Sequence, residues 1–139
     1  NTDWGHQTFA SLDGRKTGVF MNPANNPQGG AAKSGPTACL NSLSRFQAKY
    51  HGGSVQNIKF TPRMFNEDRD KIRILFDTYF KKGGCPLMVT VVDHGVLEDA
   101  QKHPEKYPDL IVRVAGYSAV FVNLTRDIQD ELLSRMLYD

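Results

Sequence analysis

The residues that suggest chemistry lie in one stretch, 113–121, which reads Arg-Val-Ala-Gly-Tyr-Ser-Ala-Val-Phe. Apolar residues at its start predict a buried strand over 110–115, and Gly116 interrupts this pattern before apolar residues resume. A glycine inside a strand usually marks a turn or a close approach of two backbones. Because it has no Cβ, glycine also reaches conformations that other residues avoid. One interpretation is a strand–turn–strand with a conformational glycine, and the other is a glycine whose own backbone carries the chemistry.

A resemblance to a known family favours the second interpretation. The run Arg113-Val-x-Gly116-Tyr117-x-x-x-Phe121 follows a His-Pro-Glu-Lys-Tyr-Pro stretch at 103–108 and precedes Leu124 and Gln129. It resembles the C-terminal signature of the glycyl radical enzymes of the pyruvate formate-lyase-like superfamily. The segments Ser-Leu-Asp-Gly-Arg-Lys at 11–16 and Gly-Pro-Thr-Ala at 35–38 resemble that family's DGR and GPTA stretches. The resemblance therefore covers nearly the whole chain, and it departs at 17–22, where relatives carry an acidic, glycine-bearing run.

In the family that this motif resembles, the glycine holds a stable carbon-centred radical, and here that glycine is Gly116. Loss of one α-hydrogen leaves a planar radical, delocalised between the amide nitrogen and the carbonyl. A Cβ would clash with that planarity, so glycine stores the radical better than alanine. Arg113, Tyr117 and Phe121 are then interpreted as packing of the radical loop, with the two aromatic rings keeping water and oxidants away. A redox role for Tyr117 is the alternative.

The resemblance also implies a fold and partners. The fold is α/β, the C-terminal part of a ten-stranded barrel of two half-sheets, with a strand–helix–strand unit and a glycine loop. An iron–sulfur, S-adenosylmethionine-dependent activating enzyme removes the hydrogen of Gly116, and the chain itself binds no cofactor. The radical then passes to a cysteine outside this chain, whose thiyl radical attacks a small organic substrate. The expected partners are this activating enzyme and the cysteine-bearing remainder of the enzyme, and a homodimer of the full enzyme is allowed.

Two reaction classes stay open. One is lysis or formation of a C–C bond, as in decarboxylases, lyases, acyl or alkyl transferases and fumarate-adding synthases, and the other is dehydration. The strand at 87–92 lacks the polar residues that dehydratases and many decarboxylases place there. Together with Val-Gln-Asn at 55–57, it favours hydrocarbon- or arylacetate-type members. Ala115 and Tyr117 favour the dehydratase and decarboxylase pattern instead.

Composition limits the other classes of function. The 139 residues suit one domain, and 40% hydrophobic with 23% charged residues is ordinary for a folded protein. A net charge of +2 without a basic cluster gives no support for nucleic-acid binding. No apolar run reaches the roughly 18 residues of a membrane span, and no signal peptide is visible. Two distant cysteines predict a reducing, cytoplasmic location. Because the first residue is Asn1, the sequence is expected to be a piece of a longer chain.

Two parts of the chain differ in composition. Residues 1–35 are rich in glycine, proline, asparagine and serine, which predicts connected turns. So long a segment without regular structure is unusual at the start of an independent domain. We therefore expect 1–35 to pack on the rest of the enzyme, to be partly disordered in the isolated chain, and to precede the glycyl radical domain at 36–139.

The pattern of apolar residues predicts alternating helices and strands. Helices are expected at 36–50, 66–82, 96–102 and 125–137. Strands are expected at 54–60, 87–92, 110–115 and 120–122. The β-branched run at 87–92 predicts a strand buried on both faces, and the helix after it predicts that 87–92 and 110–115 form a parallel pair with a right-handed crossover.

The remaining candidate residues favour structural roles. Cys39 lies beside apolar helix positions and is expected in the core, whereas Cys85, between two glycines and a proline, is expected to be more exposed. Neither matches the family's thiyl cysteine, which belongs to a loop far upstream. The spacing of the four histidines predicts no metal site, and Asp93-His94 is expected to be structural.

Two other functions remain as alternatives. The chain could be a non-catalytic spare part that replaces an oxygen-cleaved C-terminus, although the long stretch at 1–50 argues against so minimal a role. It could also be an unrelated small α/β binding module, which would never form a radical.

Overall fold

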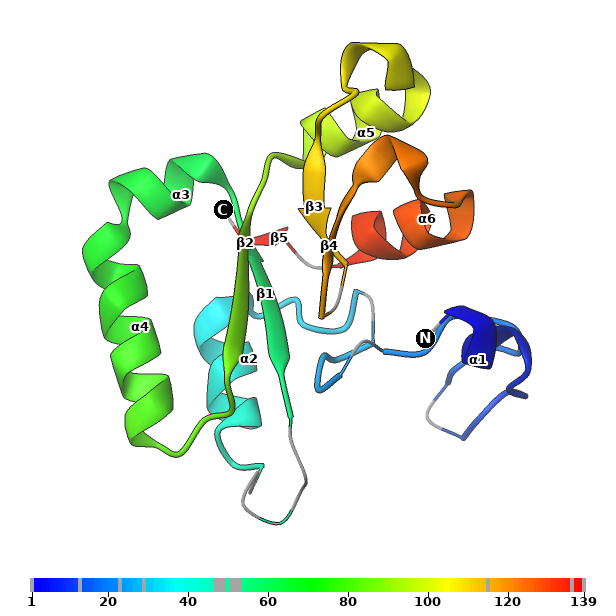
Figure 1. Ribbon diagram of the computed structural model, residues 1–139. Helices are drawn as coiled ribbons and strands as arrows, with labels where there is room; N and C mark the ends of the chain where they lie inside the picture. Colours follow the sequence, from blue (N-terminus) through cyan, green and yellow to red (C-terminus); the bar gives the residue numbers. More distant parts are fainter. Residues whose placement is uncertain are drawn as a thin grey trace.

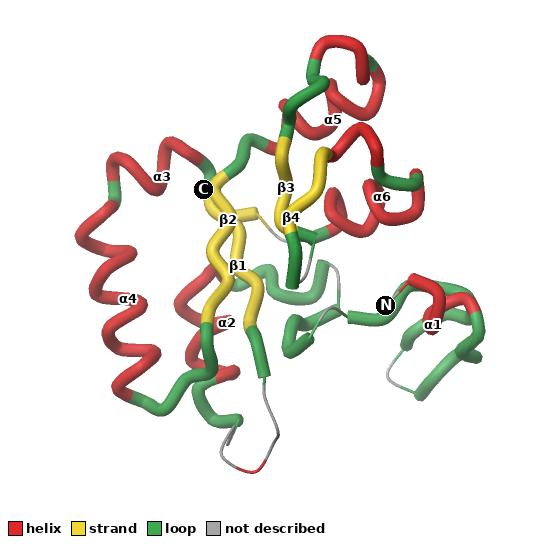
Figure 2. Tube along the Cα trace, in the orientation of Figure 1, coloured by secondary structure: helices red, strands yellow, loops and turns green. Residues whose placement is uncertain are grey.

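The computed structural model describes residues 2–12, 14–22, 24–28, 30–46, 50, 54–114, 116–135 and 137–138. Within these residues, three strands form one sheet, two strands form a hairpin beside it, and helices pack on both (Figure 1). Figure 2 shows the same arrangement, with loops making up most of the N-terminal part. The α/β class expected from the sequence is confirmed.

Strand β1 (Gln56–Phe60) is the centre of the sheet. Strands β2 (Leu87–Val91) and β5 (Leu137–Tyr138) lie on its two sides, both parallel to it. The chain crosses from β1 to β2 through α3 (Pro62–Glu67) and α4 (Arg69–Lys81), as a parallel pair requires. The sheet therefore contains a strand–helix–strand unit, although not between the strands that the sequence suggested.

Helices α2 (Gly35–Leu43) and α4 cover this sheet and close a first hydrophobic core. Its buried residues are Leu40, Ile58, Phe60, Ile72, Tyr79 and Tyr138. The single helix expected at 66–82 is instead two, α3 and α4, which meet at Asp68. Pro62 can occupy the first turn of α3 because that position needs no N–H donor, and the Thr61 side chain accepts a hydrogen bond from the Met64 N–H.

The hairpin consists of β3 (Ile111–Arg113) and β4 (Ser118–Val120), which pair antiparallel in the register Val112 opposite Ala119. Helices α5 (His94–Lys102) and α6 (Arg126–Ser134) and two short 3₁₀ turns, η2 (Pro104–Lys106) and η3 (Phe121–Asn123), surround its base. The second core lies here, and its buried residues are Leu97, Ala100, Val112, Phe121 and Leu132.

Two predictions about the strands are wrong. Among the described strands, β3 pairs with β4 and not with β2, because the turn at Gly116 reverses the chain at once. Strand β2 is an edge strand and is not buried on both faces: Val89 and Val91 are 39% and 42% exposed. The sequence also missed β5. Its pairing with β1 uses Leu137 and Tyr138, so the last helix stops at Ser134.

The described residues before α2 form turns and one short helix, α1 (Thr2–His6). The Arg15 side chain, in the DGR stretch, donates to the carbonyl oxygens of Gly5, Thr8, Phe9 and Val19 and so gathers this segment around itself. His6 Nε2 lies 3.3 Å from the Asp127 carboxylate and connects α1 to α6. The segment thus lies on the rest of the chain, and its disorder in isolation stays a prediction.

Asn26 completes the second edge of β1. Its side-chain Nδ2 donates to the Asn57 carbonyl at 2.7 Å, and its Oδ1 accepts from the Asn57 N–H at 3.0 Å. An amide side chain therefore takes the place of a strand next to the short β5. Across the described residues, no helix combines the length and the apolar character needed to cross a bilayer.

Candidate functional site

Gly116 lies at the exposed tip of the β3–β4 hairpin. A Cβ built on it would meet none of the described atoms beyond its chain neighbours within 4 Å, and its φ lies outside the left-handed region that favours glycine. By contrast, a Cβ on Gly84 would collide with the Tyr79 ring. Neither a close backbone approach nor a positive φ therefore explains glycine at position 116, which removes the support for a purely conformational glycine.

The legs of the hairpin are held by regular hydrogen bonds. The Val114 N–H donates to the Tyr117 carbonyl at 3.0 Å, directly around the tip. Further down, the Phe121 N–H donates to the Leu110 carbonyl at 2.7 Å and closes the base. The tip is thus a short, exposed turn on a paired stalk.

The residues predicted to pack around the radical loop lie in three different environments. Phe121 is fully buried in the second core, below the tip. The Arg113 Nη1 group donates to the Ser118 hydroxyl at 3.2 Å across the hairpin. Tyr117 is 53% exposed in this chain, so a role in shielding Gly116 requires packing against another part of the enzyme and stays a prediction.

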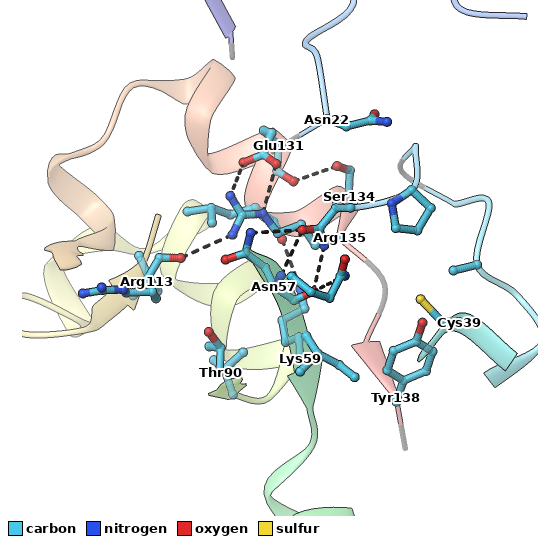
Figure 3. Close-up of a pocket in the computed structure, with 18 of the residues that line it drawn as sticks. Asn22, Cys39, Asn57, Lys59, Thr90, Arg113, Glu131, Ser134, Arg135 and Tyr138 are labelled. Atoms are coloured by element: carbon cyan, nitrogen blue, oxygen red, sulfur yellow. Dashed lines mark hydrogen bonds and ion pairs between the residues drawn. The ribbon is translucent and has the colours of Figure 1, made fainter. Parts of the chain in front are cut away.

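Arg135 connects this hairpin to α6, and the sequence did not single it out. Its guanidinium forms a two-pronged ion pair with Glu131, with Nε 3.0 Å from Oε1 and Nη2 2.9 Å from Oε2 (Figure 3). The same group donates to the carbonyl oxygens of Arg113 and Val114. Both charged side chains are nearly buried, with 11% of Arg135 and 6% of Glu131 exposed. Because Arg135 is α6's C-cap, it joins the end of α6 to the hairpin strand that leads into Gly116.

Gln129 holds the other leg. Its side-chain Nε2 lies 3.1 Å from the Phe121 carbonyl oxygen and 3.2 Å from that of Leu124, and the residue is buried. Gln129 belongs to the motif quoted above, so its spacing did point to it. Two side chains of α6, Gln129 and Arg135, thus hold the two legs of the hairpin.

A second cation, the buried Lys59, lies on the sheet side of this cluster. Its Nζ donates to the Leu132 carbonyl at 3.1 Å (Figure 3). Burial, and to a smaller extent the nearby Arg135 charge, lower the pKa of Lys59 from 10.5 to about 8, against the opposing effect of Glu131. Together Lys59, Glu131 and Arg135 line a cavity of about 50 Å³ between sheet and hairpin, which is room for a few water molecules. Gly116 is not among its lining residues.

The lowered pKa of Lys59 predicts how stability depends on pH. Between pH 8 and 10.5 Lys59 binds more protons in the unfolded chain than in the folded one, so its contribution to the unfolding free energy rises with pH. Below pH 8 the full penalty of burying the charge is present. Relative to Lys59→Met, the wild type should gain up to about 3 kcal/mol between pH 7.5 and 10.5. Urea unfolding at several pH values measures this, with the exposed Lys81→Met as control; parallel pH profiles for wild type and Lys59→Met would contradict it.

Cys39 packs against the first core, and Cys85 lies beside Tyr79 of that core. Cys39 is half-buried beside Tyr138, as expected, and burial and its thiol raise the pKa of that tyrosine. The prediction that Cys85 is more exposed is wrong, since 1% of it is exposed. The tight Gly83-Gly84 turn directs Cys85 inwards, next to Tyr79. Burial and the Cys85 thiol raise the pKa of Tyr79 to about 12.

The other polar candidates are structural. The Asp93 side chain accepts from the Gly95 N–H at 2.8 Å and caps α5. The His94 ring lies 3.3 Å from both Glu98 and the Leu133 carbonyl, and so joins α5 to α6. Within the described part of the chain, no group of three histidine, cysteine or acidic residues could hold a metal; His51 lies outside the described residues.

The chain is similar to known proteins in sequence. A protein-family model described as "Glycine radical" matches residues 21–122. The chain is 40% identical to "Probable dehydratase YbiW" of Escherichia coli (strain K12), over 97% of this chain and 17% of that protein. It is 38% identical to the trans-4-hydroxy-L-proline dehydratase of Clostridioides difficile, over 91% of this chain and 16% of that protein.

The fold has solved counterparts as well. The glycerol-bound B12-independent glycerol dehydratase from Clostridium butyricum superposes with a TM-score of 0.92 at 39% identity, over 99% of this chain and 18% of that one. The chain therefore spans about a sixth of the length of the curated relatives that it matches. The extent of the family match and these similarities agree, and the chain therefore belongs to the glycine radical family, the glycyl radical domain of the glycyl radical enzymes.

Proposed function

We propose that Gly116 stores the radical of an oxygen-sensitive glycyl radical enzyme of which this chain is one part. One observation supports this most directly. Gly116 lies in the family's motif, yet neither its φ nor its surroundings require a glycine. A residue type that the fold does not need is explained by chemistry that only this residue type performs well.

The geometry of the tip suits that chemistry. Removal of an α-hydrogen leaves a planar centre stabilised by the flanking amide nitrogen and carbonyl, and no neighbouring side chain opposes planarity at the exposed Gly116. When bound, the activating enzyme's S-adenosylmethionine and iron–sulfur cluster supply the hydrogen abstraction. This chain contributes an exposed glycine on a paired stalk, which a partner protein can reach.

The rest of the enzyme lies outside this chain. We propose that it completes the ten-stranded barrel. The edge strand β2 is one proposed point of attachment, because no described strand pairs with its outer edge and because its Val89 and Val91 side chains are exposed. We further propose that the rest of the enzyme supplies the cysteine that receives the radical and that residues 1–35 pack on it. The complete enzyme is proposed to work in the cytoplasm, with a homodimer as one allowed assembly.

The names of the similar proteins support one reaction class. The relatives compared above are named as dehydratases, of trans-4-hydroxy-L-proline and of glycerol among them. We therefore propose that the complete enzyme eliminates a group from a small hydroxylated substrate, in preference to adding a hydrocarbon to fumarate. The Ala115 and Tyr117 pattern supports this choice, whereas the apolar strand at 87–92 had favoured the other.

Electron paramagnetic resonance tests the proposal. The complete enzyme, treated anaerobically with its activating enzyme, should show a doublet from the one hydrogen left on the Gly116 α-carbon. Growth on α-deuterated glycine should collapse that doublet. The absence of any signal, or a signal that glycine deuteration leaves unchanged, would contradict the assignment. A thiyl-type cysteine loop upstream in the same reading frame distinguishes the enzyme from a spare part that only repairs one.

A further inference from the structure

We propose that Arg135 is a positioning residue, which holds Gly116 at the distance from the upstream cysteine that radical transfer needs. This inference rests on the proposed function of Gly116. The described contacts of the Arg135 side chain are with Glu131 and with the carbonyl oxygens of Arg113 and Val114, so Arg135 would act on Gly116 through the hairpin backbone.

The backbone of Arg135 is fixed from both sides. It directly follows α6, whose Leu132 is buried in the second core, and it precedes β5, which pairs with β1. Lys59 of β1 also donates to the Leu132 carbonyl near the end of α6. A side chain that starts from so constrained a position can transmit the geometry of the sheet to whatever it binds.

The Arg135 side chain binds the hairpin just before Gly116. Its guanidinium reaches the Arg113 carbonyl oxygen at 3.4 Å and also donates to that of Val114, the last described residue before the glycine. Glu131 fixes the plane of the guanidinium through two parallel contacts, at 3.0 and 2.9 Å. Such forked, charge-assisted hydrogen bonds define an orientation as well as an energy.

The other described contacts near the tip are of two kinds. The hairpin ladder and the Arg113–Ser118 hydrogen bond tie the two legs to each other. Gln129 ties the departing leg to α6, at Phe121 and Leu124, five and eight positions after Gly116, and a Cβ at Gly116 would meet none of the described neighbours. The position of the tip relative to α6 is therefore set by these two anchors, and the backbone carbonyl that Arg135 binds, that of Val114, is the one closer in sequence to Gly116. A buried ion pair is weak support for stability as such, and here its remaining donors are directed at backbone atoms beside Gly116.

The transfer that this geometry serves is a hydrogen-atom exchange. The cysteine S–H bond breaks, a C–H bond forms at Gly116, and the unpaired electron moves from carbon to sulfur; the reverse step restores the glycyl radical. A thiol proton exchanges with solvent, so in D₂O the cysteine carries deuterium and delivers it to the Gly116 α-carbon. When the thiyl radical then removes the original hydrogen, the restored glycyl radical carries deuterium. The doublet of the radical then collapses at a rate that reports how often carbon and sulfur meet, without any substrate.

The test compares variants of the complete enzyme after anaerobic activation and transfer into D₂O. Arg135→Lys keeps the charge but loses the fork, and it should form the radical yet lose its doublet about tenfold to a hundredfold more slowly, as expected for misplaced reacting groups. Glu131→Gln, which loosens the guanidinium, should slow the collapse less. Arg126→Lys is the matched control, because Arg126 makes an exposed i,i+4 pair with Asp130 on the same helix and should behave as wild type.

Several outcomes decide the question. Equal collapse rates for Arg135→Lys and wild type at equal radical content would overturn the proposal, and so would a wild-type doublet that persists in D₂O. Arg135→Lys could instead lose radical only in proportion to its folded fraction, measured by circular dichroism, while the remaining radical exchanges at the wild-type rate. That result would mean that Arg135 serves stability alone. A wild-type enzyme without any glycine radical contradicts the proposed function of Gly116 instead.

Discussion

Substitution of Gly116 by alanine is expected to abolish the radical and the turnover of the complete enzyme while the fold persists. The methyl group would enter open space at the hairpin tip, and φ lies outside the left-handed region. For this chain the unfolding free energy should therefore change by less than about 1 kcal/mol, as for most exposed positions. Paramagnetic resonance after activation and thermal unfolding of the same sample measure the two effects separately.

Gly84→Ala is the matched control, because its effects should be the opposite. A Cβ at Gly84 would collide with the Tyr79 ring in the first core, which should lower stability by about 1–3 kcal/mol. The fraction that still folds should nevertheless accept a radical. Turnover in Gly116→Ala, or loss of the signal in well-folded Gly84→Ala, would contradict the assignment of Gly116.

The second large effect is expected from oxygen. A delocalised carbon radical persists without oxygen but combines quickly with O₂, and the peroxyl species breaks the backbone at that α-carbon. Brief exposure of the activated enzyme to air should therefore cut the chain at Gly116 and yield a C-terminal peptide that begins near Tyr117. Mass spectrometry of the exposed sample identifies the position of the cut.

The unactivated enzyme serves as the control for this cleavage. The exposed tip would also suit a protease, but proteolysis would cut the activated and the unactivated chain alike. A cut that depends on activation but maps to Gly84 or Gly95 would move the radical site. No activation-dependent cut at all would leave the family assignment without a radical at Gly116.

Local sequence patterns predicted the elements better than their partners. The apolar runs located β1, β2 and β3, and Gly116 was correctly expected at a turn. The partner of β3 was predicted wrongly because a helix between two strands usually brings them side by side, whereas here β4 follows within five residues and pairs first. The apolar run of β2 suggested burial, but in this chain it borders an open edge. Two-residue β5 carries too little periodicity to be recognised.

The site divides in the same way. Gly116 and Gln129 belong to a contiguous motif, so the sequence identified them. Arg135 contacts backbone atoms 22 residues earlier, and Lys59 meets Leu132 across 73 residues, which no local pattern reveals. One signal was available: Glu131 and Arg135 are opposite charges four residues apart, at the end of an apolar helix stripe, where an ion pair is expected.

The pairing of β3 with β4 has a consequence for the fate of a damaged enzyme. The described elements after Gly116 are bound to the part before it: β4 through its ladder with β3, Phe121 and Leu132 through the second core, and β5 through β1. Cleavage at Gly116 is therefore expected to leave two fragments that remain bound to each other, as in a split protein. The binding site of the C-terminal fragment would not be empty. A replacement protein would have to compete with the cleaved C-terminal fragment for the same binding site. The rate of repair would then be limited by the dissociation rate of that fragment.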